Sequence, residues 1–169
     1  MHDRFRPRMR AMYPWYGAIL AAAALILAFP FYNAWLLSCV ALVPLFVVLL
    51  QTARTWTWRR VFLLGYFFAA VWHIGSLWWV GYVSIAGMFA LTLFIALLLA
   101  AALTVCWWLV QRGVPALAAA PCCWLVFEAT VTYLFTGFPW LLLGNAWRPW
   151  LTLAQVAELT GVYGLSALI

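Results

Sequence analysis

The sequence predicts an all-α protein, a polytopic bundle of about six transmembrane helices, and three observations support this. Of its 169 residues, 70% are hydrophobic and only 7% are charged, whereas roughly a quarter of the residues of a soluble domain are charged. Apolar runs of about 17–25 residues, the length that crosses a hydrocarbon core about 30 Å thick, recur along the chain. The chain also has 13 Trp, 12 Phe and 7 Tyr, and such aromatic residues concentrate at membrane interfaces.

The apolar runs follow one another, separated by short turns or by loops that contain arginine. They cover residues 13–29, 35–50, 61–80, 88–110, 115–135 and 153–169. The first run follows an arginine-rich arm, as in a secretory signal peptide, but it is long and has no clear small-x-small cleavage site, which favours a retained helix. The last run is still apolar at Ile169. We therefore expect residues 1–169 to be the N-terminal membrane part of a longer protein, with the sixth helix truncated.

All basic residues are arginine, and their placement indicates the orientation of the chain. They lie in the arm before the first run, in the loop after the second and in the loop after the fourth: Arg4, Arg6, Arg8, Arg10, Arg54, Arg59, Arg60 and Arg112. These are alternate connections, so the positive-inside rule predicts a cytoplasmic N-terminus and an outward-facing loop at residues 137–150. Arg148 alone breaks the pattern. Short arginine clusters between apolar runs are typical of topology signals, and we expect no nucleic-acid partner.

The sequence offers little material for metal binding. The cysteines all lie inside apolar runs: Cys39, Cys106, Cys122 and Cys123. Their spacing fits no metal knuckle and no CxxC pair, and buried cysteine usually behaves as a small hydrophobic residue. His73 stands alone in the third run, where a structural hydrogen bond is a more common role than a ligand or proton relay. We expect no metal and no cofactor.

Glu128, in the fifth run, is the main polar candidate. An ionisable side chain at membrane depth is a functional-site hypothesis, because its burial is expensive. The alternative is a structural contact, with Glu128 either protonated or paired with His73 or Arg148. Gln155 and Glu158, three residues apart, share one helical face. They either face lipid headgroups or line a site between helices.

The stretch from Leu134 to Gly144 ends the fifth run with the corner Thr-Gly-Phe-Pro-Trp. Gly137 and Pro139 stop the helix, which leaves Phe138 and Trp140 at the outer interface. A second outer cluster contains Trp78, Trp79, Tyr82 and Ser84. The aromatic residues either form an interfacial belt or build a wall for lipid tails and headgroups.

Catalysis within this chain is not expected. The sequence holds three acidic residues, two histidines and no lysine. Nucleophilic catalysis needs an activating group within hydrogen-bonding reach of the nucleophile, and no such pair is visible. We therefore assign no catalytic residue to this chain and expect it to be inactive alone.

Four stretches carry a resemblance to the apolipoprotein N-acyltransferase family. Residues 134–141, Leu-Phe-Thr-Gly-Phe-Pro-Trp-Leu, resemble the family's most recognisable membrane motif. Three others agree in order and spacing: residues 27–31 (Leu-Ala-Phe-Pro-Phe), 79–84 (Trp-Val-Gly-Tyr-Val-Ser, with Gly81 inserted) and 161–166 (Gly-Val-Tyr-Gly-Leu-Ser). The chain departs at Val131, where the family often has arginine. It departs again at Asn145-Ala146-Trp147, where members commonly read Tyr-Ser-Gln.

The resemblance implies a bacterial inner-membrane enzyme. It would transfer an acyl chain from a phospholipid donor to the diacylglyceryl-cysteine of an apolipoprotein acceptor, using a Glu-Lys-Cys triad in a nitrilase-like domain. A chain without lysine cannot contain that triad, so the resemblance implies that this domain follows residue 169. Residues 1–169 would bind lipid and position substrate. The residues assigned to that role are Trp140, Phe138, Pro139, Glu128, Glu158, Trp79, Tyr82 and Tyr163.

Two alternatives remain. The first is a non-catalytic membrane module, either a truncated relic or a subunit that pairs with a separate nitrilase-like chain. The second is a small transporter. The sequence shows no internal repeat of fixed period, which inverted-repeat transporters have, and offers few polar residues for a path across the bilayer.

Overall fold

A computed structural model describes residues 6–52 and 55–169, and within these ranges the chain is a bundle of helices without strands. The α-helices are α1 (Arg6–Ala28), α2 (Ser38–Ala41), α3 (Val43–Thr52), α4 (Trp58–Ser76), α5 (Ile85–Gln111), α6 (Ala116–Tyr133), α7 (Leu151–Ala154) and α8 (Ala157–Leu168). Four 3₁₀ helices join them: η1 (Trp35–Leu37), η2 (Trp78–Tyr82), η3 (Pro139–Leu141) and η4 (Leu143–Trp147).

The helices have the length and composition of membrane spans. Three stretches are long and apolar enough to cross a membrane, namely Trp35–Thr52, Ile85–Gln111 and Ala116–Tyr133, and Tyr13–Ala28 is a shorter apolar helix. In hydrocarbon an α-helix satisfies its own backbone hydrogen bonds, which explains why an apolar chain takes this form. The predicted all-α membrane bundle is confirmed.

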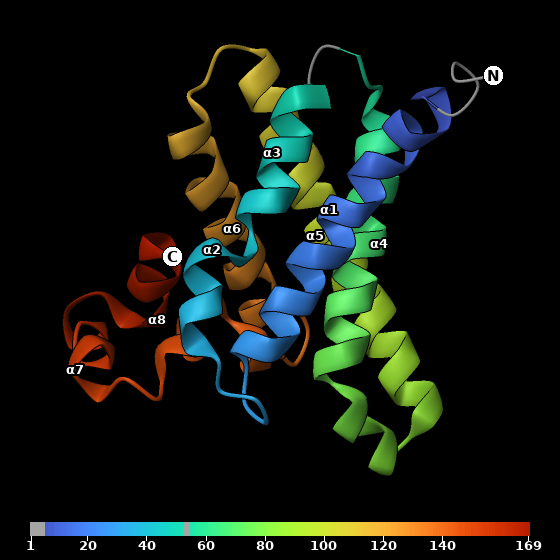
Figure 1. Cartoon of the computed structure of the whole chain (residues 1–169). Coiled ribbons are helices and arrows are strands. Elements are labelled where there is room, and N and C mark those ends of the chain that lie inside the picture. Colours follow the sequence, from blue (N-terminus) through green and yellow to red (C-terminus); the bar gives the residue numbers. More distant parts are fainter. Residues whose placement is uncertain (1–5, 53–54) are drawn as a thin grey trace.

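Successive long helices run in opposite directions (Figure 1). The start of α4 and the connection from α5 to α6 lie at the same end as the N-terminus, and the connections at 29–34 and 77–84 lie at the opposite end. Arg59 and Arg112 are therefore at one end, while Arg4 and Arg54 lie outside the described residues. The cytoplasmic orientation of the arginine-bearing end stays a prediction.

Close helix packing in the core depends on small and aromatic side chains. Ala18, Ala21 and Ala22 on α1 are fully buried, and small residues let neighbouring backbones approach closely in a membrane bundle. Trp72 on α4 is also fully buried, and its ring lies 5.9 Å from that of Trp124 on α6. The N-terminal helices, α4, α5 and α6 thus share one core.

Two predicted spans are less regular than expected. The run at 35–50 is divided into η1, α2 and α3. The run at 153–169, expected as one truncated helix, is divided into α7 and α8, and Gly161 inside α8 has a non-helical backbone with φ 67°. The hydropathy pattern was continuous there, but the positive φ interrupts the helix.

Candidate functional site

The Thr-Gly-Phe-Pro-Trp corner folds back over the end of α6. The Phe138 N–H donates to the carbonyl oxygen of Val131 over 2.9 Å, which closes the turn after the helix. Gly137 has φ 72°, and a Cβ at this position would collide with the carbonyl oxygen of Thr132. Only glycine fits such a turn without strain. Pro139 then begins η3, so the sequence correctly predicted where the helix stops.

Glu128 holds the segment that follows the corner. Its side chain is fully buried, and Oε1 accepts hydrogen bonds from Trp124 Nε1 over 2.9 Å and from the Leu143 N–H over 2.6 Å. Oε2 is buried without a partner among the described residues. One carboxyl group therefore joins α6 to the backbone on the far side of the turn.

The alternative pairing of Glu128 with His73 or Arg148 is not what the structure shows. His73 Nδ1 donates to the carbonyl oxygen of Ala69 on its own helix over 2.7 Å, and Arg148 is exposed. The partners of Glu128 are instead an indole and a backbone amide. Glu128 thus connects α6 to the segment that follows the corner.

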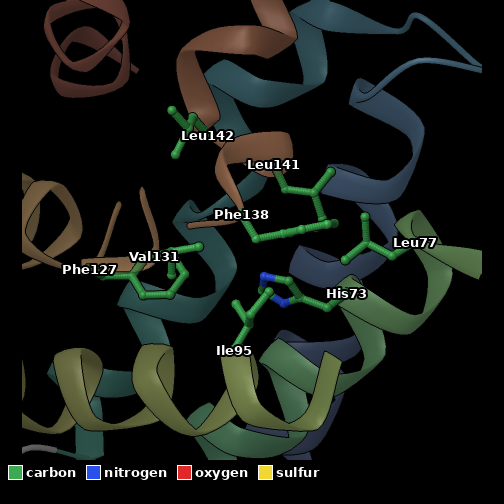
Figure 2. Close-up of a pocket in the computed structure, with 8 residues that line it drawn as sticks. All are labelled: His73, Leu77, Ile95, Phe127, Val131, Phe138, Leu141 and Leu142. Atoms are coloured by element: carbon green, nitrogen blue, oxygen red, sulfur yellow. The ribbon is translucent and has the colours of Figure 1, made fainter. Parts of the chain in front are cut away.

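His73 lies beneath the corner in a small pocket of about 10 Å³, roughly the space that one water molecule needs. Figure 2 shows its ring pointing to the centre of the surrounding side chains, below Phe138 and beside Leu77 and Ile95. Over residues 6–52 and 55–169, no group of three or more His, Cys, Asp or Glu side chains is placed to hold a metal ion. The arrangement fits the structural role of His73.

Two further hydrogen bonds attach the corner segment to distant helices. The Gly144 N–H donates to Ser166 Oγ on α8 over 2.8 Å. Trp147 Nε1 donates to Ser38 Oγ on α2 over 3.0 Å. Together with the Glu128 contact, these bonds connect residues 143–147, the segment after the corner, to three helices, α6, α8 and α2.

A groove of about 560 Å³ adjoins this segment. Its lining residues come from three parts of the chain that are far apart in sequence, within residues 29–31, 76–79 and 139–148. The rings of Trp79 and Trp140 meet edge to face with centroids 5.4 Å apart, a favoured geometry for aromatic pairs. Trp140 remains 60% exposed. Its ring can therefore contact a ligand.

A second hollow of about 460 Å³ adjoins the groove. Asn33, Asn145 and Arg148 line it, and Pro30, Asn145 and Arg148 also line the groove. The groove is thus apolar along most of its wall, with four aromatic residues among the lining, and it is polar where Asn145 and Arg148 line it. Such a combination can bind an amphipathic molecule, with its apolar part against the tryptophans.

The structure brings some of the predicted site residues together and leaves others apart. Trp79, Pro139 and Trp140 line the groove. Phe138 lies behind them, with its ring 6.1 Å from that of Trp140, and lines the small pocket with His73. Tyr82 is 82% exposed and packs on Trp78, with ring centroids 5.6 Å apart, outside the groove.

The two predicted residues on α8 also lie outside the groove. Glu158 is exposed and Tyr163 is half-buried, and neither lines the groove or the adjoining hollow. Sequence reasoning missed Asn33 and Ser76 as lining residues, and it considered Arg148 only as an exception to the charge pattern and as a possible partner of Glu128. That exception was the signal that could have identified the polar end.

Comparison with known proteins connects this geometry to a family. Residues 21–169 match the family model described as apolipoprotein N-acyltransferase N-terminal domain. The chain is 32% identical over 163 residues to an apolipoprotein N-acyltransferase of Geobacter metallireducens, covering 90% of this chain and 30% of that protein. It is also 32% identical over 165 residues to one of Coxiella burnetii, covering 90% of this chain and 33% of that protein.

A third relative, from Verminephrobacter eiseniae, is 30% identical over 179 residues, covering 95% of this chain and 33% of that protein. The chain therefore spans about a third of the length of the curated relatives it matches. The four sequence stretches, the helical bundle and the family match agree. This chain belongs to the apolipoprotein N-acyltransferase family and corresponds to its N-terminal domain.

Proposed function

We propose that this chain is the membrane domain of an enzyme that transfers an acyl chain from a phospholipid to the N-terminal diacylglyceryl-cysteine of a lipoprotein. Its own part is to bind lipid and to position it. The chain covers about a third of its relatives and contains no lysine. The catalytic Glu-Lys-Cys triad that the family resemblance implies would therefore belong to another part of the protein.

The groove between Trp79 and Trp140 is the observation that carries this proposal. Its volume, about 560 Å³, lies within the range of roughly 300–1,000 Å³ that is usual for small-molecule sites. Seven of its lining residues come from three stretches that carry the family resemblance, residues 27–31, 79–84 and 134–141. Aromatic side chains with an exposed face offer a large apolar surface to an acyl chain.

The position of the groove favours access from the outer leaflet. The connections that line the groove, at residues 29–31 and 76–79, lie at the end of the bundle opposite the start of α4 and the end of α5, where Arg59 and Arg112 stand in the sequence (Figure 1). With the arginine-bearing end in the cytoplasm, as the positive-inside rule predicts, the groove opens toward the periplasmic side of a bacterial inner membrane. A lipid held there would present its ester to a catalytic domain on that side.

The role of Glu128 in this function is to keep the Trp140 wall in place. Its hydrogen bond to the Leu143 N–H fixes the backbone three residues after Trp140. It is fully buried, so a direct contact with substrate is not part of the proposal. A carboxylate oxygen is suited to this position because it can accept two hydrogen bonds at once.

The test replaces Trp140 with alanine in the whole protein that contains this chain. Burying an aromatic side chain against an apolar partner stabilises by about 1.5–3 kcal/mol, so we expect lipoprotein triacylation to slow about tenfold or more. Mass spectrometry of the lipoprotein N-terminus measures the diacylated and triacylated forms. The matched control is Trp108→Ala, since Trp108 is 47% exposed at the other end of the bundle. Equal rates in the two variants would refute the groove as the lipid site.

A further inference from the structure

We propose that Arg148, with Asn33 and Asn145, binds the phosphate of a phospholipid headgroup at the polar end of the groove. This inference rests on the proposed lipid-binding function and adds the part of the lipid that is recognised there. Arg148 and Asn145 line both the aromatic groove and the adjoining hollow. Arg148 and Asn145 therefore border both spaces, which meet at these residues.

The lining changes from apolar residues in the groove to polar residues in the adjoining hollow, in the same order as the acyl chains, phosphate and headgroup of a phospholipid. Phe31, Trp79 and Trp140 line the apolar side of the junction, where acyl chains would lie. Asn33 lines the hollow on its other side. A phosphate lies between acyl chains and the polar headgroup substituent, so the junction is the point at which an anion would be expected.

The side chains at the junction have the chemistry for phosphate. A guanidinium group presents several N–H donors in a planar fork that fits two phosphate oxygens at once. Each asparagine amide adds two N–H donors. Neither Glu128 nor Glu158 lines either space, and Glu128 accepts from Trp124 and Leu143 instead. The junction is therefore cationic.

Both turns that carry these residues are held in place before any ligand binds. Arg148 donates its backbone N–H to the Asn145 carbonyl oxygen over 3.2 Å, and the neighbouring Trp147 is attached to Ser38. Asn33 has φ 54°, a conformation that asparagine tolerates better than most residues, and its N–H donates to the Phe29 carbonyl oxygen over 3.2 Å. A preorganised site loses less entropy when a ligand binds.

This assignment also accounts for the position of Arg148 in the bundle. Arg59 and Arg112 lie at the opposite end, so Arg148 contradicts the charge asymmetry that orients the other arginines. A phosphate-binding role gives a physical reason for one cation at this end.

The experiment compares two lipids bound to the full chain by native mass spectrometry. One is a phospholipid and the other is a diacylglycerol with the same acyl chains and no phosphate. We expect the wild-type chain to prefer the phospholipid by about tenfold, because a charge-assisted bidentate contact is roughly twice as strong as a neutral one. Arg148→Gln should abolish this preference, and Arg148→Lys, which keeps the charge without the fork, should retain part of it.

Arg112→Gln is the matched control, since Arg112 is another exposed arginine, stacked over Trp108 at 4.6 Å at the other end. It should keep the wild-type preference. An unchanged preference in Arg148→Gln would overturn the inference. Inorganic phosphate that binds the lipid-free chain through Arg148, without any advantage of phospholipid over diacylglycerol, would assign the site to a free anion and overturn it as well.

A different result would refute the proposed lipid-binding function of the groove. Trp140→Ala should weaken binding of both lipids equally, because it removes the wall for the acyl chains and leaves Arg148 in place. If Trp140→Ala binds both lipids as tightly as wild type, the groove is not the acyl-chain site. In that case Arg148→Gln could still lose the preference for phospholipid over diacylglycerol, so the two results can be told apart.

Discussion

Replacing Glu128 with alanine would show how much the corner depends on one buried carboxyl group. The wild-type Oε1 accepts from Trp124 Nε1 and from the Leu143 N–H at 2.9 and 2.6 Å. The alanine variant leaves both donors buried without a partner, and each such donor costs about 1–3 kcal/mol. The free energy of unfolding should therefore fall by about 2–6 kcal/mol.

Thermal unfolding followed by circular dichroism in detergent measures this loss. For a chain of this size, 1 kcal/mol corresponds to roughly 2–4 °C in Tm, so we expect a decrease of about 5–20 °C. Glu158→Ala is the matched control, because Glu158 is exposed on α8 and its removal should leave Tm unchanged. If Glu128→Ala unfolds at the same temperature as Glu158→Ala, the two hydrogen bonds do not hold the corner.

Glu128→Gln separates positioning from ionisation. Glutamine keeps a carbonyl oxygen that can accept both hydrogen bonds, so its Tm should lie much closer to wild type than that of Glu128→Ala. Normal triacylation by this variant in the whole protein supports a positioning role. A folded Glu128→Gln protein that has lost activity would show that the carboxyl group contributes more than its hydrogen bonds.

Two further predictions concern the contacts that hold residues 143–147. Gly144→Ala should lower the free energy of unfolding by roughly 1–3 kcal/mol through overpacking, because its Cβ would lie 2.5 Å from the Val162 carbonyl oxygen. Gly81→Ala is the control, since its Cβ would make only an ordinary contact. Equal Tm values for the two variants would contradict the prediction. Trp147→Phe and Ser38→Ala should show a coupling free energy of about 0.5–1.5 kcal/mol in a double-mutant cycle, since they remove the donor and the acceptor of one hydrogen bond. Strictly additive losses of stability would show that this bond does not contribute to the stability of the fold.

Local sequence signals predicted the helices and the corner well. The fifth run ends where Gly137 and Pro139 stand, and the structure ends α6 at Tyr133 and begins η3 at Pro139. These features depend on intrinsic backbone preferences, which act within a few residues. The same reasoning failed for the run at 153–169, because hydropathy does not report the positive φ of Gly161.

The partners of the polar residues could not be predicted in the same way. The sequence left Glu128 either with a functional role or in a structural contact, protonated or paired with His73 or Arg148. Its two partners are the Trp124 indole on the same helix and a backbone amide 15 residues away on the other side of the turn. Every residue except proline carries a backbone N–H, so no sequence pattern distinguishes Leu143 from its neighbours as the donor.

The sequence by itself determined that this protein is an α-helical membrane bundle, where its main helices lie and to which family its motifs point. Composition and hydropathy are sufficient for this, because a bilayer admits few solutions for an apolar backbone. Only the tertiary structure decided that residues 29–31, Trp79 and Trp140 surround one groove, and that Arg148 lies at its polar end. These residues meet because antiparallel helices return to the same end of the bundle, and that packing arises from contacts between distant segments.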